Sequence, residues 1–202
     1  EAIKKIEDTV GHELTQKLKD LCHLNILITG KSGVGKSTLI NNIFMEELAK
    51  EDVGEPVTKE ISALTKESIP LTIYDTPGIE LDPAQQKKLI HDIFDLISEL
   101  RKTKDVNKCI HCIWYCIHCG SSRLEESEIQ FINNFTNDSQ LGKTPVIVVM
   151  TQCYADDNRV QLKRVIASKV NNIVGIVPVV AKDKSFGKFI VPSYGLDKLV
   201  DV

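Results

Sequence analysis

The chain has 202 residues and a formal net charge of -3, which suits one compact domain with a sizeable core and leaves the domain count open. With 42% hydrophobic and 26% charged residues, the composition is globular, and the charge gives no general reason to expect nucleic-acid binding. No apolar run approaches the ~20 residues of a transmembrane segment. The six cysteines are not spread as in a secreted disulfide scaffold, so we expect a cytoplasmic protein with reduced thiols.

The first 21 residues carry apolar side chains at three- and four-residue spacings, the period of an amphipathic helix. These side chains are Ile3, Ile6, Val10, Leu14, Leu18 and Leu21. We predict a helix over 1–21 that packs on its own domain or, alternatively, offers a surface to a partner or a second copy. No apolar signal segment opens the chain, and we expect its natural start to be missing.

Short apolar runs and helical patterns alternate from residue 24 onward. The runs predict strands at Leu24–Thr29, Ile61–Lys66, Leu71–Tyr74, Cys109–Cys116, Pro145–Met150 and Val174–Val180. Helical spacing predicts helices over Leu39–Leu48 and Leu89–Leu100. This rhythm indicates an α/β fold with a doubly wound, mostly parallel sheet and helices on both faces, in which the second strand could run antiparallel to the third. We expect one domain over 22–202 that is cut short at its C-terminus, because a new helix begins there.

A phosphate-binding loop follows the first predicted strand. The segment Gly30-Lys31-Ser32-Gly33-Val34-Gly35-Lys36-Ser37-Thr38 fills Gly-x4-Gly-Lys-Ser, the P-loop or Walker A pattern, and leads into a helix. Glycines let backbone N–H groups wrap around phosphate oxygens. Lys36 can reach the β and γ phosphates, and the Ser37 hydroxyl can ligate Mg²⁺. We therefore expect the nucleotide to be bound by Lys31, Ser32, Gly33, Val34, Gly35, Lys36, Ser37 and Thr38.

A second motif, Asp75-Thr76-Pro77-Gly78, ends the strand at Leu71–Tyr74. A carboxylate at the C-terminal end of such a strand faces the crevice where α/β sheets bind ligands. We expect Asp75 to hold Mg²⁺ and the Gly78 amide to sense the γ-phosphate.

With GKSGVGKST and DTPG in place, the chain resembles the translation-factor class of P-loop GTPases, which includes Era-like, septin-like and immunity-associated proteins. The resemblance implies GTP or GDP as ligand and Mg²⁺ as cofactor. It also implies a threonine, between the two motifs in the sequence, that closes over Mg²⁺ and the γ-phosphate. We choose Thr58, with Thr65 as the competitor, and assign Lys36, Thr58 and Gly78 to catalysis and Ser37, Thr58 and Asp75 to the metal.

The resemblance also implies switch segments that γ-phosphate orders and hydrolysis releases. Ile79 and Glu80 stand where efficient relatives carry glutamine, and Gly33 stands where potassium-stimulated relatives carry asparagine. We expect slow hydrolysis, at about 10⁻⁴ per second when unassisted, which an activating protein or a homodimer could accelerate.

The base pocket departs from the Asn/Thr-Lys-x-Asp motif of the family. Thr151 fits, but Gln152 replaces the lysine and Tyr154 replaces the aspartate that reads guanine. Asp156 or Asp157 could substitute, although both could instead cap a helix that begins at Asn158. Ala181-Lys182 resembles the loop whose amide contacts the guanine oxygen. We therefore expect Thr151, Gln152, Asp156, Ala181 and Lys182 at the base.

Four cysteines and two histidines lie within Cys109–Cys119. In zinc sites built from two Cys-x2-Cys halves, about a dozen residues separate the two halves. Here only three residues separate Cys112 from Cys116. Side chains of a strand alternate between its two faces, so four ligands cannot converge on one metal ion. We therefore interpret the cysteines as thiols buried in a strand. Arg123, which follows, is a candidate to approach the nucleotide or a dimer partner.

Three alternative functions remain on the sequence alone. The chain could be a nucleotide-loaded scaffold with negligible turnover, a P-loop NTPase with adenine or relaxed base preference, or a cysteine-dependent metal or redox module.

Overall fold

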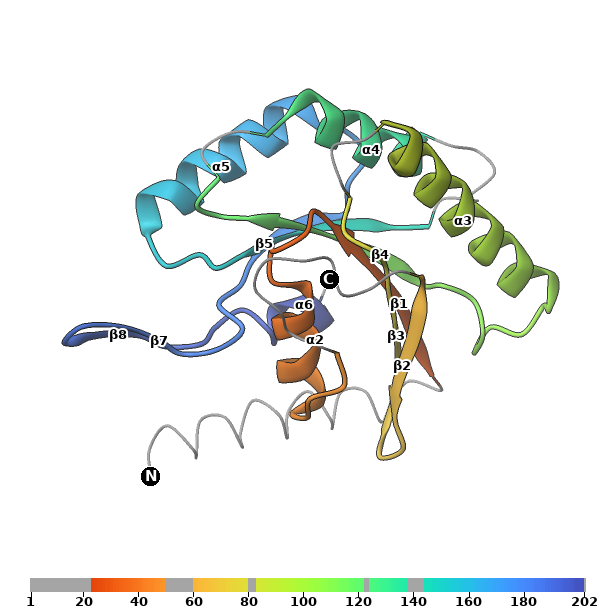
Figure 1. Cartoon of the computed structure of the whole chain (residues 1–202), viewed down its shortest axis with the longest axis horizontal. Coiled ribbons are helices and arrows are strands. Elements are labelled where there is room, and N and C mark those ends of the chain that lie inside the picture. The colour runs from red at the N-terminus through yellow and green to blue at the C-terminus, as the bar shows by residue number, and fades with distance from the viewer. Residues whose placement is uncertain (1–22, 50–59, 80–82, 122–123, 138–143, 202) are drawn as a thin grey trace.

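The structure, a computed structural model, describes residues 23–49, 60–79, 83–121, 124–137 and 144–201. The predicted helix over 1–21 lies outside these ranges. A central sheet runs through the domain, with helices on both of its faces (Figure 1).

The strands of the structure are β1 (Leu24–Gly30), β2 (Ser62–Lys66), β3 (Ile69–Asp75), β4 (Cys112–His118), β5 (Val146–Thr151), β6 (Gly175–Pro178), β7 (Lys184–Phe186) and β8 (Phe189–Val191). The helices are α2 (Lys36–Phe44), α3 (Pro83–Lys102), α4 (Glu126–Asn137), α5 (Asp156–Lys169) and α6 (Lys198–Asp201).

The main sheet has six strands in the order β2-β3-β1-β4-β5-β6. Neighbouring strands are parallel except β2, which pairs antiparallel with β3. The predicted fold class is confirmed, including the antiparallel edge strand. Because β1 lies between β3 and β4, the loops that follow these three strands meet at one edge of the sheet.

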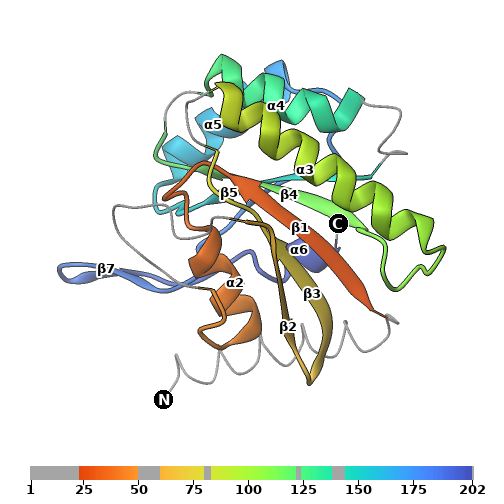
Figure 2. The same ribbon diagram turned by 45° about the vertical axis from the view of Figure 1, so that its right-hand side comes forward.

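The sheet separates two apolar cores, one on each of its faces. Along β4, Ile113, Tyr115 and Ile117 face the core beneath α3, α4 and α5, whereas Trp114 and Cys116 face the core beneath α2 and α6. Figure 2 shows the same division of helices. Each fully buried large aliphatic or aromatic side chain stabilises the fold by about 1.5–3 kcal/mol, so the strongly apolar strands follow from burial on both faces.

Several predicted boundaries were wrong for local reasons. Strand β4 begins at Cys112 and not at Cys109, because Asp105 starts a turn in which its carboxylate accepts the Asn107 N–H (3.0 Å) and its carbonyl accepts the Cys109 N–H (3.3 Å). Helix α2 ends at Phe44, since Met45 has a left-handed φ of 52°.

The last predicted strand is shorter than expected. Strand β6 stops at Pro178, and Val180 then forms an antiparallel bridge with Tyr194. The hairpin β7–β8 and helix α4 had no counterpart in the sequence prediction.

Candidate functional site

The phosphate loop connects β1 to α2 and depends on three glycines. Gly30, Gly33 and Gly35 have φ angles of 143°, 73° and 96°, which side chains with a Cβ adopt only with strain. A Cβ at Gly30 would also collide with the Cys116 carbonyl of β4. The loop therefore has the unusual backbone dihedral angles that the motif predicts, and it also packs closely on β4.

Lys36 opens helix α2 and carries its charge into the loop. Its side chain is buried, and Nζ donates to the carbonyls of Gly30 (2.9 Å) and Lys31 (3.1 Å). Ser37 and Thr38 are half-buried in the first helical turn. The ammonium group and the N-terminal end of the helix dipole thus lie together, an arrangement that favours bound anions.

The outer side of the loop contacts helix α4. Lys31 Nζ lies 2.9 Å from a Glu125 carboxylate oxygen and 3.3 Å from one of Glu128. The Glu128 oxygen also accepts the Glu125 N–H (3.1 Å), and Glu128 is buried. This contact was not predicted; its one signal in the sequence is a glutamate at the third position after Glu125, the spacing at which a side chain reaches back to a helix start.

The Asp75–Gly78 motif lies directly against the phosphate loop. Asp75 is buried at the end of β3 and is in register with Ile28 of β1. The Ile79 N–H donates to the Gly30 carbonyl (3.2 Å). A Cβ at Gly78 would meet the Ser32 hydroxyl and lie 2.8 Å from the Ser32 backbone nitrogen. The two predicted motifs therefore lie in direct contact with each other.

Thr58, Glu80 and Arg123 lie outside the described residues. Thr65 is exposed on edge strand β2.

The loop after β5 reaches the phosphate loop through two side chains. The buried Thr151 hydroxyl donates to the Val34 carbonyl and lies 3.1 Å from the Ile117 carbonyl. Gln152 has a left-handed φ of 54°, and its amide nitrogen would lie 3.4 Å from a Cβ at Gly35. Gln152 therefore lies beside the phosphate loop.

Tyr154, Asp156 and Asp157 differ in their contacts. The Tyr154 ring packs edge-on against Phe186 of β7, with centroids 5.3 Å apart. Helix α5 begins at Asp156, not at Asn158, and its N-terminal cap is Ala155 with no side-chain hydrogen bond, so the capping interpretation was wrong. Asp156 is exposed and pairs with Arg159 (2.9 Å), whereas Asp157 is exposed in the same turn.

Ala181 and Lys182 follow the bridge at Val180. Ala181 is half-buried, and Lys182 is exposed. They lie three and four residues beyond the end of β6, the strand next to β5, so the predicted base residues gather at one end of the sheet.

The described cysteines do not surround a shared point, because Cys112 and Cys116 lie on β4 while Cys119 follows this strand and Cys153 follows β5. Burial raises the pKa of the Cys112 and Cys116 thiols to about 12. Cys119 and Cys153 hydrogen-bond to each other, which lowers the pKa of Cys119 and raises that of Cys153. Within the described ranges, no three His, Cys, Asp or Glu side chains are grouped as metal ligands.

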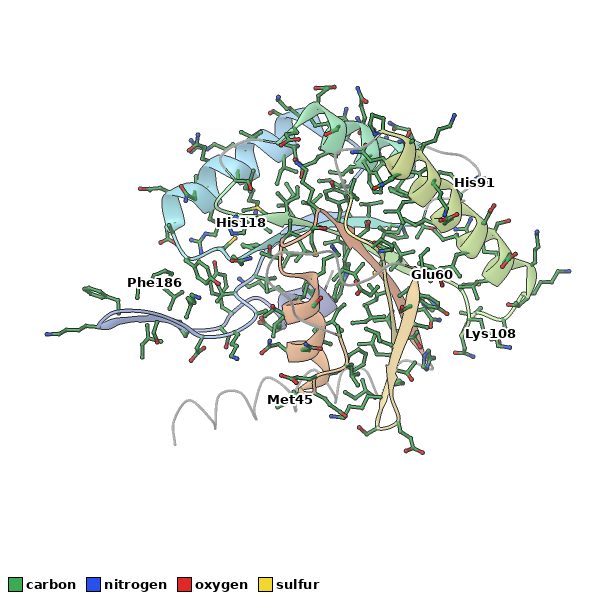
Figure 3. All side chains as sticks on the ribbon, viewed as in Figure 1. Met45, Glu60, His91, Lys108, His118 and Phe186 are labelled. Carbon is green, nitrogen blue, oxygen red and sulfur yellow. The ribbon has the colours of Figure 1, made fainter. Side chains whose placement is uncertain are left out.

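A cavity of about 290 Å³ lies next to the Asp75–Gly78 motif. Pro77, Gly78 and Ile79 form one wall, and α3 residues including Gln86 and Leu89 form the other. Figure 3 shows the labelled His91 on this helix, on the far side of the molecule from Phe186.

Residues 25–152 match the sequence family described as 50S ribosome-binding GTPase. This match covers both phosphate motifs, β1 to β5 and the start of the base loop. The chain belongs to this family of P-loop GTPases.

Curated relatives of this GTPase domain include septins. Septin-9 from Homo sapiens is 26% identical over 196 residues, which cover 85% of this chain and 33% of that protein. The chain thus spans about a third of the length of this septin.

Solved structures of GTPases share the fold. Toc33 from Arabidopsis thaliana, solved with GDP and Mg²⁺, has a TM-score of 0.60 at 20% identity, with 96% of this chain and 89% of Toc33 covered. Another Toc33 structure is described as showing that dimerization is important for GTPase activity of chloroplast translocon components. Era, solved with MgGDPNP and 16S ribosomal RNA nucleotides, has a TM-score of 0.60 at 25% identity, covering 89% of this chain and 56% of Era. Together with the septins, these structures identify the chain as a small GTPase domain of the Era and septin type.

Proposed function

We propose that this GTPase domain binds Mg²⁺ with GTP or GDP, hydrolyses GTP slowly, and acts as a nucleotide-controlled switch or assembly module. The observation that carries the proposal is Lys36, whose ammonium group lies at the start of α2 and is held by the Gly30 and Lys31 carbonyls. In this position it can approach the β and γ phosphates without a large movement of the loop. Residues 31–38 would surround the phosphates with backbone N–H groups.

The residues near the phosphate loop also suit Mg²⁺. Ser37 supplies a hydroxyl and Asp75 a carboxylate, and oxygen ligands of this kind are those Mg²⁺ prefers, with phosphate and water completing the shell. When bound, Mg²⁺ would neutralise charge that develops on the β and γ phosphates. Asp75 is already buried beside β1, so its carboxylate needs little further ordering. We propose Thr58 as the third protein ligand.

The switch would work through the contact between Gly78 and Ser32. A γ-phosphate held by the phosphate loop would lie where the Gly78 amide can donate to it, and its loss would free the segment that follows. The tight packing of Gly78 on Ser32 and the Ile79–Gly30 hydrogen bond support this coupling. Because Ile79 is apolar and buried, it cannot orient an attacking water, which supports slow turnover.

For the base, we propose guanine, read by the loop after β5 and by Ala181 and Lys182. Gln152 would cover the base beside Gly35, and the Ala181 amide would contact the guanine oxygen. Asp156 would have to release Arg159 before accepting hydrogen bonds from the base. This requirement favours a weaker base preference than a dedicated carboxylate would give and keeps an adenine-tolerant NTPase as the second candidate.

We propose that residues 22–202 form the G domain and residues 1–21 a helix attached to it, in a cytoplasmic protein. No helix in the described part of the chain is long and apolar enough to cross a membrane.

A homodimer or an activating protein would accelerate hydrolysis, as dimerization matters for Toc33. The Era structure contains RNA, so the expectation of no nucleic-acid partner has no support from the relatives.

Calorimetric titration with Mg²⁺-GDP and Mg²⁺-ADP tests the base and phosphate assignments together. We expect tighter binding of GDP and loss of binding in Lys36→Ala. Equal or tighter ADP binding would contradict guanine selectivity and leave the phosphate site intact. Phosphate release from GTP then separates the hydrolase from a non-hydrolysing scaffold.

A further inference from the structure

The β7–β8 hairpin extends sideways from the body of the domain. Both ribbon views show it reaching past α2, away from the sheet (Figures 1 and 2). Within the described part of the chain its two strands pair only with each other. Its turn is Gly187-Lys188, and Gly187 has a φ of 61°, so the tip is a tight and well-defined turn.

Large apolar side chains are concentrated at this tip. The exposed fractions are 48% for Phe186, 79% for Phe189 and 56% for Ile190. Elsewhere in the described ranges, exposed large apolar side chains stand singly on separate segments: Met45, Val106, Val160 and Val174. Single exposed apolar residues are ordinary, whereas a contiguous exposed group indicates an interaction surface.

The apolar side chains occupy both faces of the hairpin. Phe186 pairs with Phe189, and Ser185 pairs with Ile190. Because consecutive side chains of a strand point to opposite faces, Phe186 and Phe189 share one face while Ile190 lies on the other. A flat protein surface could cover only one of these faces, but a fluid apolar medium surrounds both.

The charge on the hairpin indicates what kind of medium it would enter. Residues 182–190 contain Lys182, Lys184 and Lys188 and a single acid, Asp183, giving a net charge of +2 on a chain of -3. Asp183 accepts the Ser193 N–H (2.6 Å) at the base of the hairpin, which leaves the lysines to dominate the outer part. Apolar tips flanked by lysine suit the boundary between acyl chains and anionic headgroups.

We propose that the tip of the β7–β8 hairpin, residues Phe186 to Ile190, docks the chain onto an anionic lipid bilayer. Phe189 and Ile190 enter the boundary between headgroups and acyl chains, and Lys184 and Lys188 contact lipid phosphates. Phe186 connects the tip to the base loop through the Tyr154 ring. The docking does not depend on the function proposed above.

Cosedimentation with vesicles tests the proposal. We expect the chain to bind vesicles that contain phosphatidylserine and not vesicles of phosphatidylcholine alone. The double variant Phe189→Ser with Ile190→Ser should lower the partition coefficient about tenfold or more, and Lys188→Gln should lower it about fivefold. Phe186 is left unchanged because its ring packs on Tyr154.

Matched controls lie on the other side of the molecule. Val106 is 71% exposed, and the nearby Lys108 is labelled far from Phe186 in Figure 3. We expect Val106→Ser and Lys108→Gln to bind vesicles as the parent does, and all four variants to keep their thermal unfolding and GDP affinity. Absent vesicle binding, or an equal loss in control and hairpin variants, would overturn the proposal. So would a parent chain that is dimeric by light scattering and becomes monomeric in the hairpin variant without preferring anionic vesicles.

Discussion

At the scale of single residues, the hydroxyl of Thr151 joins three parts of the site. It contacts carbonyls of Val34 in the phosphate loop and Ile117 in β4, and it is buried. Replacing Thr151 with valine keeps the volume but leaves buried carbonyls without this donor. We expect Thr151→Val to lower the free energy of unfolding by about 1–3 kcal/mol and to weaken GDP binding, as measured by urea denaturation and calorimetry.

Thr29 provides the control for that experiment. It is fully buried on β1, and its hydroxyl has no hydrogen-bond partner among the described residues. Thr29→Val therefore removes an unpaired polar group and should leave stability unchanged or raise it. Equal destabilisation by both substitutions would mean that the Thr151 hydrogen bonds contribute little.

Gly78 is the second residue whose identity is set by contact. An added Cβ would meet Ser32 through both its hydroxyl and its backbone nitrogen, so the Asp75–Gly78 segment must withdraw from the phosphate loop. We expect Gly78→Ala to bind GDP nearly as tightly as the parent but to lose about tenfold or more in affinity for a non-hydrolysable GTP analogue. Fluorescent-nucleotide titration measures both.

Combining Gly78→Ala with Ser32→Gly removes only the hydroxyl part of the collision. If the pair restores analogue binding completely, the backbone contact is unimportant and the proposed sensing geometry is wrong.

At the scale of elements, the long periodic segments were predictable and the local exceptions were not. Apolar runs located β1, β3 and β5 within one or two residues, because strands buried on both faces need continuous apolar side chains. The shift of β4 came from one aspartate that starts a turn at Asp105. The β7–β8 hairpin was missed because its six strand residues are mostly exposed and show no buried periodicity.

The link between the phosphate loop and α4 gives a prediction at this scale. Lys31 contacts two glutamates, but Glu128 is 6% exposed and Glu125 is 52% exposed. Glu128 also accepts the Glu125 N–H at the start of the helix. We expect Glu128→Ala to cost about 1–2 kcal/mol of unfolding free energy, and Glu125→Ala less than about 1 kcal/mol.

Chemical denaturation at low and high salt compares the two variants. An exposed pair is screened by salt, whereas a buried one is screened much less. A larger loss in Glu125→Ala would show that the buried contact does not anchor the helix.

At the scale of the whole molecule, the sequence carries clearer motifs for the phosphate half of the candidate site than for its base half. Residues 30–38 and 75–78 carry motifs whose chemistry requires those residue types at that spacing, and the structure brings them together. The base loop lacks the usual motif at Gln152 and Tyr154, so spacing alone could not assign its roles. The packing of Tyr154 on Phe186 joins segments about thirty residues apart, which no local pattern reveals.

The same division leads to a prediction about turnover. The proposed phosphate site lies within one chain, but the apolar side chain of Ile79 provides no group that could orient water, so the proposed acceleration would have to come from elsewhere. If a second copy supplies the missing group, GTP hydrolysis per molecule should rise from about 10⁻⁴ per second as protein concentration increases, and it should level off when the dimer is saturated. Phosphate release measured over a wide range of concentration tests this, with Lys36→Ala as the blank. A rate per molecule that stays constant while light scattering reports a dimer would exclude the second copy as activator and leave a separate protein partner as the source of the acceleration.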